Sequence, residues 1–208
     1  MPGSTPDGRF ASPATEPSLE RTAAALAEHG IAVEILDDAA AARRRVSELI
    51  PAGASVFTSA SESLRLSGID DDLNATGRYD AIKPRVQRMD LLAQADEFRR
   101  LIATPDFVVG SVAAVTETGT IVVASGSGSQ IPAYSGGAGR AIWIVGAQKV
   151  VPDLNTALQR LDEHSLPLEN IRTQAAYGRP SAINRLLIIN AVQPGRVTVL
   201  LLREVIGF

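Results

Sequence analysis

The predicted fold rests on residues 106–149, which read DFVVGSVAAVTETGTIVVASGSGSQIPAYSGGAGRAIWIVGAQK. Three apolar runs, at residues 107–115, 120–124 and 141–147, have the length and composition of buried strands. The residues that follow these runs carry carboxylate, hydroxyl, amide and ammonium groups. Such groups at strand ends are how an α/β protein builds a pocket at the edge of its sheet.

The remaining segments alternate between predicted strands and helices, which is typical of an α/β domain with parallel pairing and right-handed crossovers. A polar connector at residues 68–90 is expected to be a surface loop or a lid. The last two strands, at residues 184–190 and 196–204, are expected to pair with each other around Pro194 and Gly195. Earlier strands are predicted at residues 31–36 and 54–59. Helices are predicted over residues 18–29, from Asp37 or Asp38 to residue 50, over residues 91–103, from Asp153 onward, and over residues 166–177.

Length and composition favour one domain over residues 18–208, preceded by a disordered tail over residues 1–17 that is rich in Pro, Gly, Ser and Thr. The chain is 45% hydrophobic but only 4% aromatic, so its core is aliphatic. The absence of a signal-peptide pattern and of any run of 18 apolar residues leads us to expect a cytoplasmic protein with no membrane partner.

Charged and metal-binding residues exclude several classes of function. The net charge is −3 without a large basic block, so no nucleic-acid partner is expected. The chain has no cysteine, which excludes disulfides and an iron–sulfur cluster held by cysteines of this chain. It has two histidines and no pattern of metal ligands around them, so no metal site is expected.

Two charged residues are the candidate catalytic groups. Glu117 follows an apolar run, and partial burial there would raise its pKa and suit it to proton transfer or nucleophilic attack. The alternative is a solvated carboxylate in a turn. Lys149 ends a predicted buried strand, where its ammonium can pair with a carboxylate ligand or with Glu117; the alternative is a lysine that leaves the sheet into solvent.

Small polar residues are the candidate ligand-binding groups. Ser59 and Glu62 fit a capping box, which would turn the free N–H groups of a helix start toward an anion, although an ordinary cap has the same pattern. The loop after residue 124 is rich in Ser and Gly, so its backbone can approach an oxyanion closely; a surface loop is the alternative. The expected ligand-binding residues are Ser59, Ser61, Ser125, Ser129, Gln130 and Gln148.

Four segments, in order along the chain, resemble the LUD-domain family, which is named for lactate utilization: GSVAAVTETGTIVVASGSGSQ, VGAQKVVPDL, LPLENIR and NRLLIIN. The connector GRYD…MD and the C-terminal IGF are also similar, so the resemblance covers residues 23–208. One departure is Ala147, which stands where the family's GTQK segment has a threonine hydroxyl. Gln148 and Lys149 of that segment are retained.

The resemblance implies a Rossmann-like sheet flanked by helices, similar to that of CoA transferases, ribose-phosphate isomerase and translation initiation factor 2B. Proteins of that superfamily bind small anionic or phosphorylated ligands at strand ends. Family members such as lactate utilization protein C accompany an iron–sulfur oxidoreductase system that converts L-lactate to pyruvate. Because this chain has no cysteine, partner subunits would carry the clusters.

We therefore expect a lactate-utilization protein whose pocket takes a small carboxylate or phosphorylated ligand. A stand-alone CoA-transferase-like or sugar-phosphate-isomerase-like enzyme that uses Glu117 is an alternative, as is a non-catalytic ligand-binding subunit. The sequence leaves open which of these it is, and whether the chain forms a homo-oligomer.

Overall fold

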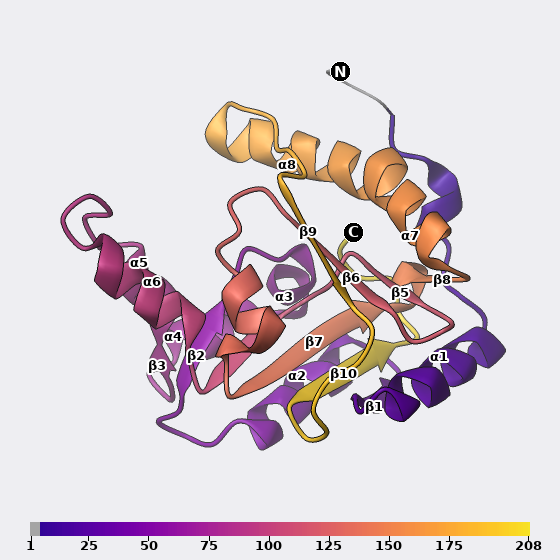
Figure 1. The fold of residues 1–208 in the computed structure, drawn as a ribbon, viewed down its shortest axis with the longest axis horizontal. Coiled ribbons are helices and arrows are strands. Elements are labelled where there is room, and N and C mark those ends of the chain that lie inside the picture. Colours follow the sequence, from indigo (N-terminus) through magenta and orange to yellow (C-terminus); the bar gives the residue numbers. More distant parts are fainter. Residues whose placement is uncertain (1–4) are drawn as a thin grey trace.

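Six strands form a parallel sheet in the computed structural model, which describes residues 5–208 (Figure 1). Every strand pairing in this first sheet is parallel. Its strand order is β1 (Ala32–Leu36), β10 (Val197–Leu202), β7 (Arg140–Gly146), β4 (Phe107–Gly110), β2 (Ser55–Thr58) and β3 (Asp80–Ala81). The predicted α/β architecture is confirmed.

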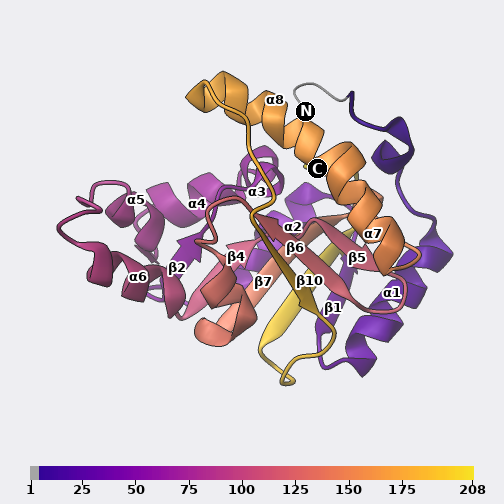
Figure 2. The same cartoon turned by 45° about the horizontal axis from the view of Figure 1, so that its top comes forward.

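A second sheet of four strands lies against one face of the first (Figure 2). β5 and β6 form an antiparallel hairpin around Gly119, whose φ of 82° suits the turn. β5 also pairs in parallel with β8, and β6 pairs antiparallel with β9. The strand order is β8 (Val150–Val151), β5 (Ala114–Thr116), β6 (Ile121–Ser125) and β9 (Arg185–Ile189).

The prediction that the last two strands pair with each other is wrong. β10 lies between β1 and β7 in the first sheet, whereas β9 pairs with β6 in the second. Their burial explains the difference. β10 is almost wholly buried, as a central parallel strand covered on both faces must be, and β9 exposes most of its residues.

The apolar run at residues 107–115, which predicted one strand, is divided between the two sheets. β4 ends at Gly110, and the chain crosses at residues 111–113 to begin β5. β7 makes the same crossing through a 3-10 helix, Ala147–Lys149, to reach β8. Because β4 pairs with β7 and β5 pairs with β8, the two crossings lie side by side.

Helices cover both faces of the first sheet. Alternate residues of β7 show the two sides: Trp143 packs in the same core cluster as Leu26 of α1, whereas Ile144 packs with Val46 of α2. The helices are α1 (Glu16–Glu28), α2 (Ala39–Leu49), α3 (Glu62–Ser67), α4 (Ile69–Ala75), α5 (Ile82–Val86), α6 (Ala95–Ala103), α7 (Leu154–Arg160) and α8 (Leu166–Tyr177). The predicted loop or lid at residues 68–90 instead contains α4, β3 and α5, which pack on the end of the first sheet.

The expected disordered tail differs from the structure at residues 5–17. A 3-10 helix, Gly8–Ala11, buries Phe10 beside Val151 and Leu161, and Asp7 N donates to Glu163 O at 2.8 Å. The apolar side chain of Phe10 supplies the burial that the surrounding composition does not indicate. Residues 1–4, where the rest of that prediction falls, lie outside the described residues. Within residues 5–208, no helix is both long and apolar enough to cross a membrane.

Candidate functional site

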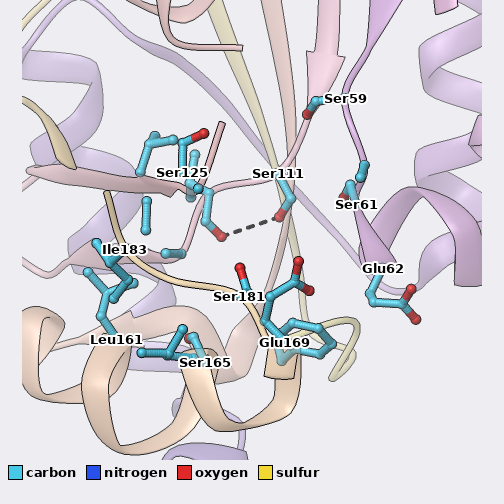
Figure 3. Close-up of a pocket in the computed structure, with 18 of the residues that line it drawn as sticks. Ser59, Ser61, Glu62, Ser111, Ser125, Leu161, Ser165, Glu169, Ser181 and Ile183 are labelled. Atoms are coloured by element: carbon cyan, nitrogen blue, oxygen red, sulfur yellow. Dashed lines mark hydrogen bonds between the residues drawn. The ribbon is translucent and has the colours of Figure 1, made fainter. Parts of the chain in front are cut away.

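A cavity of about 160 Å³ lies where the strands β2, β4 and β7 end and the second sheet begins. The edge of a parallel sheet at its carboxyl ends is the common position of a ligand site in α/β proteins. The side chains that surround it come from separate parts of the chain and face a common space (Figure 3). Its polar lining includes Ser59, Ser61, Glu62, Ser63, Ser111, Ser125, Gln130, Lys149, Ser165, Glu169, Arg172 and Ser181.

Lys149 is the charged group at the inner end of this cavity. Its side chain is buried, and Nζ donates to Ser111 Oγ at 2.9 Å and to Ser63 Oγ at 3.1 Å. Among residues 5–208, no carboxylate forms an ion pair with it. Burial, and secondarily the charge of Arg160, lowers the pKa of Lys149 to about 7. Lys149 thus lines the cavity and does not leave the sheet into solvent. Its catalytic role stays a prediction.

Ser111 and Ser63 hold the Lys149 nitrogen, and neither was a sequence candidate. Ser111 lies at the crossing from β4 to β5, and its hydroxyl donates to Ile144 O at 2.7 Å while it accepts from Lys149. Ser63 lies in the first turn of α3 and is buried. Ser111 is the polar residue that directly follows β4, which is the signal that could have identified it. Because residues 107–115 were predicted as one strand, Ser111 did not stand at a predicted strand end.

A second buried cation lies behind Lys149. Arg160 is wholly buried, with Nε donating to Gln148 O at 3.1 Å and Nη1 donating to Ala113 O at 2.6 Å and Ser165 Oγ at 2.8 Å. Its Nη2 has no hydrogen-bond partner among the described residues, and burial lowers its pKa to about 10. This arginine therefore ties the two crossings together and keeps the potential at the inner end of the cavity positive.

Ser59 and Ser61 both line the cavity, as predicted, but the expected capping box is wrong. Ser61, not Ser59, is the N-cap of α3, and its hydroxyl accepts from Leu64 N at 3.4 Å. Glu62 is then the first residue of the helix, too early to reach back to the cap. Its carboxylate pairs with Arg65 at 2.7 Å, and the bonds from Arg65 lower the pKa of Glu62.

The Ser/Gly loop after β6 is folded on itself. Ser125 Oγ donates to Gln130 Oε1 at 2.9 Å and accepts from Gly128 N at 2.8 Å. The loop thus uses one of the backbone N–H groups that were expected to face an anion. Ser125 and Gln130 line the cavity, whereas Ser129 lines two adjoining hollows.

Gln148 does not line the cavity, so the prediction of a ligand-binding amide there is corrected. Its Nε2 donates to Ile206 O and Gly207 O, both at 2.9 Å, and its Oε1 accepts from Ile206 N at 3.3 Å. These bonds fasten the C-terminal segment beside the cavity, where Phe208 is part of the wall. Neighbouring residues in the 3-10 helix point in different directions. The side chain of Gln148 therefore points to the C-terminal segment, and that of Lys149 points to the cavity.

Glu117 also lies outside the cavity, at the turn between β5 and β6. It accepts from Ser18 Oγ at 2.5 Å and forms an ion pair with Arg21 at 2.8 Å. The Ser18 hydroxyl, and then Arg21, lower the pKa of Glu117, against the predicted rise. The apolar run before Glu117 predicts burial, but Ser18 and Arg21 are donors on α1, which is far from Glu117 in the sequence.

α8 contributes Leu166, Glu169 and Arg172 to the wall of the cavity. Glu169 and Arg172 form an ion pair at 2.7 Å, and this bond raises the pKa of Arg172. Ser59, Ala60 and Arg172 also line both adjoining hollows, so the three spaces share one rim. Within residues 5–208 no cluster of three or more His, Cys, Asp or Glu side chains could hold a metal ion.

Residues 19–202 match the LUD domain, so the chain belongs to the LUD domain family. The solved structures include a DUF162 family protein from Deinococcus radiodurans with a similar fold. The similarity has a TM-score of 0.54 at 14% sequence identity and covers 89% of this chain and 96% of that one. No curated protein matches the sequence.

Proposed function

We propose that this chain is a lactate-utilization protein that binds a small carboxylate at Lys149, within a system that oxidises L-lactate to pyruvate. Membership of the LUD domain family, which is associated with lactate utilization, supports the proposed role in lactate metabolism. One observation carries the binding site: the Lys149 nitrogen is buried at the inner end of the cavity and has only serine hydroxyls as partners among the described residues.

The electrostatics of the cavity favour an anion. A buried ammonium without a counter-ion costs several kcal/mol of solvation free energy, on the order of what a well-placed carboxylate recovers. Arg160 adds a second uncompensated positive charge nearby. Glu62 and Glu169 are each paired with an arginine of their own helix, so neither carboxylate neutralises the charge of Lys149. A bound anion can neutralise it.

The size and lining of the cavity favour a small hydroxylated or keto acid. About 160 Å³ is close to an engineered protein cavity that holds one benzene-sized molecule. Serine hydroxyls line one part of the wall, and Val112, Val123 and Leu161 line another. A three-carbon acid presents a carboxylate, an adjacent oxygen and a methyl group, which match these surfaces.

The redox step would belong to other subunits. The chain has no cysteine, so iron–sulfur clusters held by cysteines would have to reside in partners. We infer that this chain supplies the carboxylate site, and that electrons leave through an iron–sulfur oxidoreductase.

Calorimetric titration tests the site. The purified protein is titrated with L-lactate, pyruvate and inorganic phosphate, and the same titrations are repeated on Lys149→Met. We expect saturable binding of a carboxylate that the Lys149→Met variant loses. Lys83→Met is the matched control, because Lys83 already pairs with Asp70 at 2.7 Å. Equal binding by Lys149→Met would contradict the proposal.

The metabolic role needs a separate experiment. Deletion of the gene is expected to prevent growth on L-lactate as sole carbon source, and the intact gene, but not the Lys149→Met allele, is expected to restore it. Normal growth of a deletion strain that lacks any other lactate-oxidising enzyme would contradict the role.

The alternatives predicted from sequence are less well supported. A CoA transferase or sugar-phosphate isomerase that uses Glu117 would need this carboxylate in the cavity, but Glu117 pairs with Arg21 elsewhere. A non-catalytic ligand-binding subunit would use the same contacts to Lys149 as our proposal. Turnover assays on each ligand that binds, with and without partner subunits, separate these two functions.

A further inference from the structure

The two lysines of the chain lie in opposite electrostatic environments. Lys83 and Lys149 are the only lysines among its 20 basic residues. Lys83 Nζ donates to both carboxylate oxygens of Asp70, at 2.8 and 2.7 Å, so a carboxylate balances its charge. Lys149 Nζ donates to Ser63 and Ser111, which carry no charge.

Within residues 5–208, no charged group that faces the cavity favours the ammonium form of Lys149. Arg160, on α7, repels it. The carboxylates of Glu62 on α3 and Glu169 on α8 are bonded to Arg65 and Arg172. The pKa of Lys149 is about 7, so near neutral pH a large fraction of the side chain is the free amine. A free amine is a nucleophile that condenses with carbonyl groups.

The position of the nitrogen completes the requirements for such a condensation. Lys149 lines the cavity and is shielded from bulk water, because only 2% of the residue is exposed. Two hydroxyls within 3.1 Å fix the direction of Nζ. Ser111 is itself held by its bond to Ile144 O, so it can orient the amine and exchange protons with it.

We propose that Lys149 captures a 2-oxo acid covalently, as an imine between Nζ and the keto carbon. The inference rests on the proposed function, because it uses the same carboxylate-binding cavity, and it assigns the ligand to the class of short 2-oxo acids. A 2-hydroxy acid of the same length occupies the cavity but forms no such bond, since it has no carbonyl carbon.

The step is a condensation without any oxidant or reductant. The amine nitrogen attacks the keto carbon, and the carbonyl electron pair moves to oxygen. The nitrogen then gives up one proton and this oxygen takes one, which forms a neutral carbinolamine. The resulting carbinolamine loses its C–O bond and a proton from nitrogen, which releases one water and leaves the C=N bond. Ser63 and Ser111, which contact Nζ, are the hydroxyls in position to carry these protons.

Borohydride trapping tests the proposal on the full chain. Pyruvate is added, sodium borohydride reduces any imine to a stable secondary amine, and peptide mass spectrometry locates the modified residue. We expect one pyruvate-derived adduct per chain at Lys149 and none at Lys83. Excess L-lactate should suppress labelling by occupying the cavity. The Lys149→Arg variant, which keeps a cation but has no reactive amine, should lose the adduct, whereas Lys83→Arg should keep it.

Each outcome has a distinct meaning. Calorimetric binding of pyruvate without an adduct at Lys149 would overturn the imine and leave the carboxylate site standing. Absence of both binding and adduct would overturn the proposed function as well. Labelling of Lys83 or the α-amine to the same extent as Lys149 would show non-specific chemistry and would also overturn the imine.

Discussion

Lys149 Nζ lies 2.9 Å from Ser111 Oγ, although the two residues are 38 positions apart in the chain. They meet because β4 and β7 are neighbours in the first sheet. After each of these strands the chain crosses to the second sheet, where β5 and β8 are again neighbours. The two crossings thus place a buried amine and a hydroxyl at one point, with Arg160 bridging the carbonyls of Gln148 and Ala113 behind them. The proposed ligand site depends on this double crossing.

The buried amine should make stability depend on pH. The folded pKa of Lys149 is about 7, whereas an unfolded lysine has a pKa of about 10.4. Between these values the unfolded chain binds more protons, so stability rises with pH, by up to about 1.4 kcal/mol per pH unit. Urea unfolding at pH 7, 8 and 9 is expected to show this rise in the wild type and a flatter profile in Lys149→Met. Lys83→Met should keep the wild-type slope; identical slopes in the wild type and Lys149→Met would contradict the shift.

Gly110, the last residue of β4, should not tolerate a side chain. A Cβ atom there would overlap the hydroxyl of Tyr134, which is buried. We expect Gly110→Ala to cost about 1–3 kcal/mol of unfolding free energy, measured by urea denaturation. Gly8→Ala is the control, because, apart from Gly8 and its neighbours in the same 3-10 helix and chain, no atom of the described residues lies within 4 Å of its Cβ position.

A double-mutant cycle identifies the cause of that loss. Tyr134→Phe removes the overlapping oxygen together with its hydrogen bond to Ser111 O. The combined Gly110→Ala and Tyr134→Phe variant should therefore lose less stability than the two single losses added together. Simple additivity would show that the hydroxyl is not what excludes a side chain at Gly110.

Gln148 should stabilise the C-terminal segment. Truncation to Ala leaves Ile206 N and O and Gly207 O without their side-chain partner, and Ile206 is buried. Loss of buried partners typically costs about 1–3 kcal/mol. We expect this loss in urea unfolding, together with faster hydrogen exchange of the Ile206 amide. Gln174→Ala, on the exposed side of α8, should change neither quantity; unchanged exchange in Gln148→Ala would contradict the anchoring role.

Glu117 should matter for local packing but not for ligand binding. Its ion pair with Arg21 is partly exposed, and such pairs contribute about 0.2–1 kcal/mol. Glu117→Gln is therefore expected to lower unfolding free energy by no more than about 1 kcal/mol, and to leave the calorimetric affinity for the carboxylate ligand unchanged. A marked loss of affinity would show that Glu117 reaches the site after all.

Much of the cavity could be predicted from strand ends. Ser59, Ser61, Ser125, Gln130 and Lys149 each follow a predicted apolar run, and each lines the cavity. The rule that carboxyl ends of parallel strands meet at one edge gathers Ser59, Ser61 and Lys149. Ser125 and Gln130 follow β6, which pairs antiparallel in the second sheet, so the packing of the two sheets brings them to the cavity. Arg172 could not be found in this way, since it lies on α8, a helix whose position over that edge depends on tertiary packing.

The α/β class and most of the buried strands follow from the sequence alone, because hydrophobic periodicity is local and is written in consecutive residues. The family follows from the segments that resemble it, and the match over residues 19–202 shows it. The division into two sheets and the partner of each polar group depend instead on contacts between distant parts of the chain. The order of the strands brings together residues that are far apart in the chain. Glu117 therefore bonds to α1, Gln148 to the C-terminal segment and Lys149 to Ser111. A local hydrophobic pattern predicts which strands are buried. The chemistry of a site depends instead on which distant residues the sheet brings within hydrogen-bond distance.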